Sequence, residues 1–562
     1  MNKLLSFDFW KEFLPKSISV WRYGYTLKDL KKDILSGFTV SIVALPLSMA
    51  LAIASGTTPD KGLFTAIVAG FIISAIGGSR FQIGGPTGAF VVLVFETIQK
   101  HGYEGLAITT IMAGIILVIS ALLRIGRYIK YIPYPVITGF TSGIALIIFT
   151  TQINDIFGFG IKNQPDNFFL KWLVYFKNLG NIHYPTFLIA ILTLAIIVAV
   201  RKFKPLWPSF LIGMIISTLV CHFLHLDIAT IGSKFGDIPS SLPTPSLPQN
   251  ITIDRIKILF PDACIIAFLA GIESLLSAIV ADGMTGSKHR SNCELLAQGI
   301  ANIIAPIFGG IPATGAIART ATNIKSGARS PFSGMFHALF ILLFMMFLAP
   351  LAKHIPLAVL GAILVIVAWN MSEINHFRNI MIAPRGDSMV LLATFILTVA
   401  IDLTFAIKTG VILSAIVFMH RMSQAIDLKS FITPINKDNV FYQPNFDAYS
   451  TLEMPEGVEA FKLRGPLFFG VSAHIVDMIN NISHPRTLII ALDDVPFVDI
   501  SAENSLSILI KKCKEQKINI VISSNTAQVT KSAKKAVVKT GHGSKVTYAK
   551  NFDKAIKLAQ KL

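Results

Sequence analysis

Apolar residues gather in long runs along this chain, separated by short polar segments. Many of the runs approach the length of about 20 residues that an α-helix needs to cross a bilayer. The clearest lie at 34–54, 105–123, 186–200, 209–224, 262–281, 331–350, 355–369, 388–401 and 404–419. Shorter or interrupted runs lie at 62–77, 87–98, 133–151, 293–308 and 313–322. The pattern predicts a polytopic α-helical membrane protein with about fourteen spans.

The pattern changes after Arg421, where short apolar stretches alternate with amphipathic ones. Residues 458–481 predict a strand, a turn and a helix, and residues 486–516 predict a strand, a loop and a helix. A further strand at 517–524 and a helix at 553–562 complete the series. Such alternation is typical of a small α/β domain. We therefore expect a cytoplasmic segment at 1–33, a membrane domain at 34–421, a linker at 422–440 and an α/β domain at 441–562.

Composition supports the membrane assignment. Apolar residues make up 53% of the 562 residues, charged residues only 15%, and the mean hydropathy is +0.62. The net charge of +18 could indicate nucleic-acid binding, but its distribution indicates membrane orientation instead. Basic clusters follow every second predicted span, at 124–130, 201–204, 288–290, 325–329, 378–385 and 421–429. This positive-inside pattern predicts that both termini are cytoplasmic.

Two of the shorter runs are interrupted in the same way. The stretch "IGGPTGAF" covers 83–90 and "GGIPATGAIART" covers 309–320. Aligning Thr87 with Thr314 gives an offset of 227 residues, which also brings the span around Pro46 onto the span containing Glu273. Matching interruptions in two halves are typical of inverted-repeat transporters, whose substrate site lies near the membrane midplane.

The interruptions offer a chemistry suited to anions. Pro86 and Pro312 can open helices because proline lacks the N–H that a first turn leaves unpaired. Thr87 and Thr314 can then cap these helices, and the glycine that follows each lets a ligand approach the main chain closely. Two helix amino ends that converge at mid-depth form an anion site. The alternative is a pair of ordinary Gly/Pro kinks between packed helices.

Glu273 is the most informative ionisable residue, because no other charge lies between Asp262 and Asp282. A carboxylate inside the membrane costs roughly 2.5–3.5 kcal/mol even on the lenient insertion scale. Two helix ends offer an anion about 4 kcal/mol at most. An ionised Glu273 about 4 Å away would repel it by about 4 kcal/mol at an effective dielectric constant near 20.

Neutralisation of Glu273 on substrate binding is therefore the coupling hypothesis. A proton is favoured. Sodium is the alternative, with Ser277 and the 313–314 main chain as further ligands. A protonated glutamate that only bonds to a neighbour is the structural alternative.

Several of these stretches resemble the SulP family of anion permeases, which includes sulfate permeases. They are "LPLSMALAIASG", "GGPTGAF", "GIESLLSAIVADGMTGSKHRSNCELLAQGIANIIAPIFGG" and "GGIPATGAIARTATNIKSGA". The chain is most similar to bacterial members that carry C4-dicarboxylates aerobically. The resemblance implies a seven-plus-seven inverted repeat with core and gate domains, an elevator-like movement and a homodimer.

The resemblance also implies the substrate-site residues. They are Pro46, Thr87, Gly88, Ala89, Ala313, Thr314, Gly315, Ala316 and Arg319. Arg319 either helps to hold the anion, as in some relatives, or is a cytoplasm-facing residue. Many relatives carry glutamine and tyrosine where this chain has Leu47 and Leu51, which leaves a less polar wall.

The tail resembles the STAS domain of the same family. Ser501 lies where anti-sigma-factor antagonists are phosphorylated, but Ile500 and Ala502 depart from the usual pattern. The residues therefore favour Ser501 as a helix N-cap over a phosphorylation site. The resemblance implies regulation, dimer contacts or a cytoplasmic protein partner for this domain.

Taken together, the sequence predicts a secondary active transporter in a bacterial inner membrane. Its substrate is a small anion, such as sulfate or a C4-dicarboxylate like succinate or fumarate, carried with a proton. The alternatives are a sodium-coupled bicarbonate or sulfate symporter and an uncoupled anion channel or exchanger. No nucleophile–base set, metal cluster or phosphate-binding GxxxxGKS motif appears in the sequence, so we expect no enzyme activity, no cofactor and no metal.

Overall fold

The structure is a computed structural model. It describes residues 12–22, 24–127, 133–161, 164–165, 167–204, 207–383, 385–401, 403–424, 427–432, 455–469, 485–540 and 546–562. The chain divides into two compact units, Met1–Ser414 and Ala415–Leu562, with the division inside the helix α18. In the described part of the chain, nine helices are long and apolar enough to cross a membrane.

The first half of the membrane unit contains α2 to α9 with one short strand. Its elements are α2 Lys16–Arg22, α3 Leu27–Ala54, α4 Pro59–Ile76, β1 Gly84–Gly85, η1 Gly88–Phe90, α5 Val91–Leu122, η2 Ile125–Arg127, α6 Tyr134–Phe157, α7 Phe168–Lys177, η4 Leu179–Asn181, α8 Tyr184–Phe203 and α9 Ser209–Phe223.

The second half repeats the order of long helices around a second short strand. Its elements are α10 Ile231–Phe235, α11 Ile253–Thr285, α12 Ser291–Ile304, η5 Ala305–Phe308, β2 Thr314–Gly315, α13 Ile317–Lys325, α14 Phe332–Ala352, α15 Leu357–Met371, α16 Ile374–Ile382, α17 Arg385–Ala400 and α18 Leu403–Gln424.

The predicted spans correspond to these helices. The two runs at 87–98 and 105–123 are the two arms of α5, which Gly102 separates with a left-handed φ of 69°. The clear runs at 209–224 and 388–401 correspond to α9 and α17, and the shorter runs at 293–308 and 313–322 correspond to α12 with η5 and to α13. Each of these helices is too short to count among the nine. The amphipathic helices α7 and α16 were not predicted, because neither contains a membrane-length apolar run.

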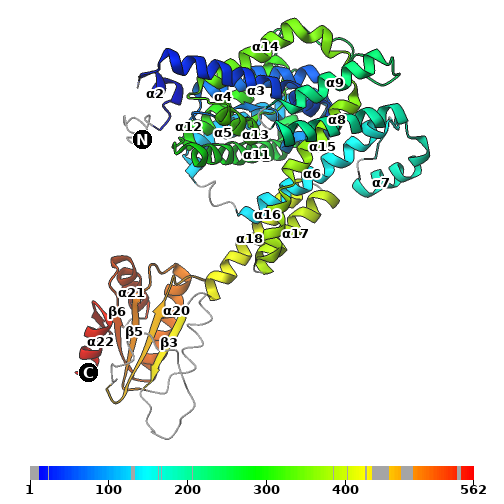
Figure 1. Ribbon diagram of the computed structural model, residues 1–562. Helices are drawn as coiled ribbons and strands as arrows, with labels where there is room; N and C mark the ends of the chain where they lie inside the picture. Colours follow the sequence, from blue (N-terminus) through cyan, green and yellow to red (C-terminus); the bar gives the residue numbers. More distant parts are fainter. Residues whose placement is uncertain are drawn as a thin grey trace. The chain divides into compact units, whose positions relative to one another are not determined.

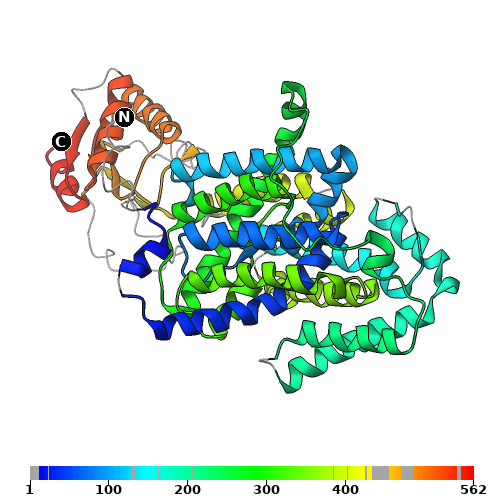
Figure 2. The same ribbon diagram turned by 90° about the horizontal axis from the view of Figure 1, so that it is seen from above.

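Helices from the two halves interleave in one bundle. α14 packs against α3 and α4, and α12 packs against α4 and α5. Figures 1 and 2 show the blue first-half helices among the green second-half helices, with α7, α8 and α9 grouped at the side. A second group of contacts joins α6 to α15 and α17, and α8 to α15. This division into two helix groups matches the expected core and gate arrangement.

The second unit contains a five-stranded sheet in the order β3-β4-β5-β6-β7. Its strands are β3 Asp427–Ile432, β4 Val458–Arg464, β5 Thr487–Asp494, β6 Asn519–Ser523 and β7 Val546–Ala549, and its described helices are α20 Ile500–Glu515, α21 Ala527–Lys539 and α22 Phe552–Ala559. β3 is antiparallel to β4, and the other neighbours are parallel. One apolar core packs α20 and α21 on one face of the sheet, and a second packs α22 on the other.

The α/β domain departs from the prediction in three elements, one of which is the edge strand β7, which was not predicted. β3 lies within residues 422–440, which the sequence analysis assigned to a linker, and it adds an antiparallel edge to the sheet. α21 was not predicted, because its apolar positions are separated by lysines and threonine. The helix predicted within 458–481 lies mostly outside the described residues.

Candidate functional site

The two interrupted segments meet. Gly84 pairs with Gly315 and Gly85 with Thr314 in a short antiparallel ladder. The Ala316 N–H extends the ladder by donating to the Ile83 carbonyl at 2.8 Å. The prediction that the interruptions converge is confirmed. They converge as paired extended segments, and the antiparallel pairing fits two repeats of opposite orientation.

Ser274 of α11 holds the second segment in place. The Gly315 N–H donates to Ser274 Oγ at 3.0 Å, and the Thr314 hydroxyl donates to the Ala270 carbonyl at 3.0 Å. Because that bond uses the only proton of Thr314, Ser274 donates its own proton to Thr314 Oγ1 across 2.8 Å. Ser274 was not predicted as a site residue, although it follows Glu273 directly.

Glu273 contacts the first segment from the same helix. The Thr87 hydroxyl donates to Glu273 Oε2 at 2.9 Å. No lysine, arginine or histidine in the described part of the chain pairs with this carboxylate. α11 therefore touches both interruptions, one through Glu273 and the other through Ser274.

The expected capping role of the two threonines is wrong. Neither η1 nor α13 begins with a side-chain capping bond, and α13 begins at Ile317 after Ala316. The Thr87 hydroxyl donates to Glu273 and the Thr314 hydroxyl to the Ala270 carbonyl, so both side chains are directed to α11. Both hydroxyls therefore bond to α11 and not to the main chain of the helix that follows each threonine.

Several main-chain amides of the second segment are already occupied. Asn302 of α12 accepts from the Ala313 N–H at 2.9 Å and donates to the Ala313 carbonyl at 2.8 Å. Gly315 and Ala316 donate to Ser274 and Ile83, as described above. The expectation of free N–H groups at these three residues is therefore wrong, because the protein itself uses them.

Free donors remain at the two helix starts. The N–H groups of Gly88 and Ala89 have no partner among the described residues, nor have those of residues 317–319 in the first turn of α13. Both starts follow the paired strands within three residues. Unpaired amides and the positive end of the helix dipole favour a bound anion there.

Arg319 is buried, with 2% of its surface exposed. Its Nη2 donates to the Pro86 carbonyl at 2.6 Å, and its Nε and Nη1 have no partner among the described residues. A Cβ atom on Gly85 would lie 2.6 Å from Nη1, so glycine is needed for this approach. The burial of Arg319 contradicts the cytoplasm-facing alternative. Its Nε and Nη1 remain as hydrogen-bond donors beside the paired strands.

Ser277 is directed away from the role predicted for it. Its hydroxyl donates to Thr320 Oγ1 at 3.1 Å, and the same oxygen accepts from the Ile83 N–H at 3.1 Å. Ser277 therefore links α11 to α13, and Thr320 in turn links α13 to Ile83, which directly precedes β1. The structure gives no bond between Ser277 and Glu273.

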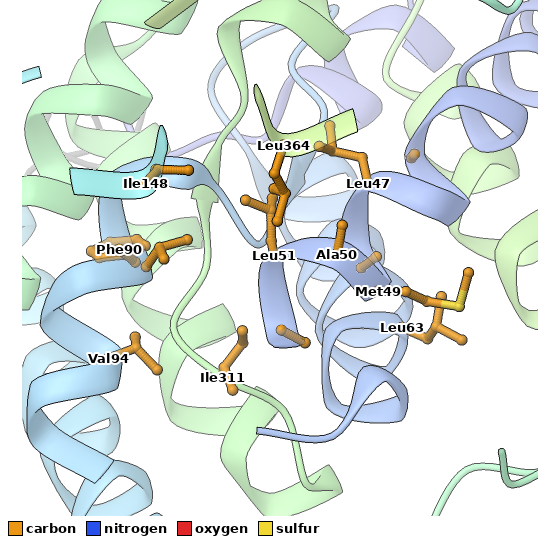
Figure 3. Packing of buried hydrophobic residues seen from close by; sticks show 14 of the residues in the cluster. Leu47, Met49, Ala50, Leu51, Leu63, Phe90, Val94, Ile148, Ile311 and Leu364 are labelled. Atoms are coloured by element: carbon orange, nitrogen blue, oxygen red, sulfur yellow. The ribbon is translucent and has the colours of Figure 1, made fainter. Parts of the chain in front are cut away.

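Pro46 lies inside α3 and is buried, one residue before an apolar wall. Leu47 and Leu51 share one cluster with Phe90 of η1, Ile311 and Leu364 of α15 (Figure 3). The prediction of a less polar wall at these two positions fits this packing. α3 thus contributes shape and apolar surface to this region.

Comparison with known proteins shows the family of this chain. The sequence pattern described as "Sulfate permease family" matches residues 30–394, and the STAS domain pattern matches residues 449–555. The chain belongs to the sulfate permease family. It is an anion transporter of this family, with a C-terminal STAS domain.

The relatives and solved structures agree with this assignment. The chain is 42% identical to the putative sulfate transporter YvdB of Bacillus subtilis, over 94% of this chain and 97% of that one. It is 30% identical to the bicarbonate transporter BicA of Picosynechococcus, over 88% and 89%.

Among solved structures, the transmembrane domain of a cyanobacterial BicA aligns with a TM-score of 0.61 at 28% identity, over 70% of this chain and 98% of that one. The murine anion transporter Slc26a9, in the inward-facing state, aligns with a TM-score of 0.85 at 17% identity, over 99% and 96%. The expected fold class of this permease family is thereby confirmed.

The STAS domain corrects one local prediction. α20 begins at Ile500, and its N-cap is Asp499, whose Oδ1 accepts from the Ala502 N–H at 2.8 Å. Ser501 lies inside the first turn and is not the cap. Asp499, two residues before Ser501 in the stretch "VDIS", caps the helix instead.

Proposed function

We propose that this protein is a secondary active transporter that binds a small oxyanion where β1 meets β2 and couples its movement to protonation of Glu273. One observation carries the proposal. The two interrupted segments pair with each other, and the first bonds to a membrane carboxylate that has no cationic partner among the described residues. Anion donors and a proton acceptor thus share one location.

The donors suit an oxyanion. Amides at Gly88, Ala89 and the start of α13 would bind its oxygens, and Arg319 would supply positive charge from behind the strands. The names of the relatives favour sulfate or bicarbonate as the first substrates to test. The C4-dicarboxylates succinate and fumarate come second.

Proton coupling follows from the position of Glu273. An anion beside an ionised glutamate would be repelled, and a proton on the carboxylate removes that repulsion. Protonated Glu273 could itself donate a hydrogen bond to the anion or to Thr87. Sodium is the second candidate coupling ion, since carboxylate, hydroxyl and main-chain oxygens are hard ligands.

The wider architecture of the transport cycle belongs to the same proposal. The α3–α5 and α11–α14 group would move as an elevator against the α6, α8, α15 and α17 group, in a homodimer. Both termini would lie in the cytoplasm of a bacterium, as the basic clusters between spans indicate. The STAS domain would be regulatory, and Ser501, which is partly buried in the first turn of α20, remains a candidate phosphorylation site.

The test is uptake into proteoliposomes of labelled sulfate, bicarbonate, succinate and fumarate, with a proton gradient or a sodium gradient imposed in turn. We expect one of these anions to accumulate when the proton gradient is imposed. Glu273→Gln should make the remaining uptake independent of pH, because the glutamine cannot exchange a proton.

The matched control is Glu104→Gln, since Glu104 is half-exposed and pairs with Arg255 at 3.6 Å. It should keep the pH profile of the unmodified protein. If Glu273→Gln keeps that profile as well, Glu273 is not the coupling residue. Accumulation under a sodium gradient alone would replace the proton with sodium in the proposal.

A further inference from the structure

The turn inside α5 brings a tyrosine onto the second interrupted segment. Gly102, with its left-handed φ of 69°, ends the first arm of this helix, and Tyr103 directly follows it. The Tyr103 hydroxyl donates to the Gly310 carbonyl at 2.9 Å. No other group in the described part of the chain donates to this carbonyl, so its hydrogen bond depends on Tyr103.

Gly310 belongs to the stretch that leads into β2. It is buried, and it lies only a few residues before the strand that pairs with β1. A buried carbonyl that loses its donor is destabilised, and the chain around it shifts to find another partner. The Tyr103 hydroxyl therefore restrains the segment that carries one half of the proposed anion site.

A lysine of α4 restrains the Tyr103 ring in turn. The Nζ atom of Lys61 lies 3.5 Å from the centroid of the ring, which is a close cation–π contact. One turn along α4, Thr65 Oγ1 accepts from the Ile311 N–H at 2.7 Å and donates to the Lys61 carbonyl at 2.7 Å. The first turns of α4 thus hold both Tyr103 and the second segment.

The first arm of α5 connects the two interrupted segments. One end begins with η1 at the unpartnered amides of Gly88 and Ala89. The other end is fastened through Tyr103 to Gly310. Because this arm is a regular helix of about three turns, it transmits a shift at one end to the other. The two sets of proposed anion donors are therefore fixed relative to each other by the β1–β2 ladder and by the Tyr103–Gly310 bond.

We propose that Tyr103 is a positioning residue for the anion site and that Lys61 holds its ring in place. Tyr103 acts through the main chain, by fixing the start of α13 relative to the start of α5. This role rests on the proposed function, because it concerns the same anion site. Loss of the hydroxyl should weaken anion binding and leave the maximal rate nearly unchanged, since Glu273 and the anion donors all remain.

The test compares Tyr103→Phe with the unmodified protein in proteoliposomes, with labelled sulfate, bicarbonate, succinate and fumarate as probes. For each anion that the unmodified protein accumulates, we expect KM to rise at least fivefold and the maximal rate to stay within twofold. Hydrogen exchange of the main-chain amides at 311–316 should become at least fivefold faster, because the segment has lost a restraint. Tyr184→Phe is the matched control, since Tyr184 is 71% exposed, and it should change neither quantity.

Lys61 supplies a second set of variants. Lys61→Arg keeps a cation over the ring and should keep the KM of the unmodified protein, whereas Lys61→Gln should raise KM at least twofold. In the Tyr103→Phe background, Lys61→Gln should add nothing, because the hydroxyl that it positions is already absent. Effects that multiply in the double variant would show that Lys61 attracts the anion directly and would overturn the role assigned to it.

Unchanged KM and unchanged exchange in Tyr103→Phe would overturn the inference, as would a fall in the maximal rate without a rise in KM. Faster exchange throughout the membrane unit would indicate general destabilisation and would overturn it too. Absence of uptake by the unmodified protein would instead contradict the transport proposal. In that case the exchange at 311–316 would still decide whether Tyr103 positions the second segment.

Discussion

Thr87 and Glu273 lie 186 residues apart in the sequence, and one hydrogen bond of 2.9 Å joins them. A hydrogen bond to a charged group contributes about 1.5–3 kcal/mol. Thr87→Val keeps the shape of the side chain and removes the donor, so we expect anion uptake to fall by at least about tenfold. Uptake into proteoliposomes at a fixed proton gradient measures the change.

Two further variants separate this bond from general damage. Thr87→Ser restores a donor and should recover most of the uptake. Thr322→Val alters a hydroxyl on the exposed side of α13, which bonds only to the Ala318 carbonyl, and should leave uptake unchanged. Normal uptake by Thr87→Val would show that the Thr87–Glu273 bond has no part in transport.

The sequence predicted which residues carry the chemistry better than it predicted their partners. Glu273 stood out because a carboxylate in an apolar run is costly, and Thr87 and Thr314 stood out because their motif occurs twice. Ser274 and Asn302 were not assigned to the site, because serine and asparagine side chains in membrane helices are expected to bond to a neighbouring helix. Their importance comes from contacts with a strand that no local pattern places.

At the scale of elements, the β1–β2 pair depends on close packing around Gly315. A Cβ atom there would lie 1.8 Å from Gln82 Nε2, and Gln82 is buried with 4% of its surface exposed. Gly315→Ala should therefore displace β2 or Gln82, at a cost of about 1–3 kcal/mol. We expect a lower melting temperature and a strong loss of uptake, measured on the same purified protein.

A second substitution should rescue this variant. The side-chain amide of Gln82 has no partner among the described residues, so Gln82→Ala sacrifices no protein hydrogen bond. Added to Gly315→Ala, it should restore most of the stability, a coupling that a double-mutant cycle measures. Gly283→Ala is the control, because a Cβ there meets no atom within 4 Å. Purely additive losses in the cycle would contradict the proposed clash.

Elements were predictable where a single periodic signal dominates. Long apolar runs gave the helices of the membrane unit, and apolar strands such as β5 and β6 gave the centre of the sheet. β3, β7 and α21 were not found, because the two edge strands are short and show little alternation of apolar and polar residues, and lysines separate the apolar positions of α21. The pairing of β1 with β2 joins two-residue segments far apart in sequence, so only the internal repeat pointed to it.

At the scale of the whole molecule, each unit has hydrophobic cores of its own. No cluster of buried apolar residues in the described chain contains side chains from both units. All five tryptophans, at positions 10, 21, 172, 207 and 369, belong to the membrane unit. Tryptophan fluorescence therefore reports on the membrane unit alone. The stability of the STAS domain can be followed separately, by the proteolytic release of a C-terminal tag.

This separation allows a pH prediction for the STAS domain. Burial at the end of β5 raises the pKa of Asp493 above its ordinary value of 3.8, although the Ser523 hydroxyl donates to its Oδ2 at 2.6 Å. A raised folded-state pKa means that the folded domain holds the proton more tightly than the unfolded chain. Its stability should therefore fall as pH rises from near 3.8 through the folded-state pKa, and the penalty is complete above it.

Asp493→Asn removes the ionisable group and keeps an acceptor for Ser523. We expect it to raise the temperature of thermal proteolysis of the STAS domain at pH 7, with the gain shrinking as pH approaches 4. The tryptophan melt of the membrane unit should not change. Asp553→Asn, at an exposed position on α22, is the control and should give no gain that depends on pH. An equal rise in the proteolysis temperature at pH 4 and pH 7 for Asp493→Asn would show that burial does not destabilise the Asp493 carboxylate. A shifted tryptophan melt would show that the two units do not unfold independently.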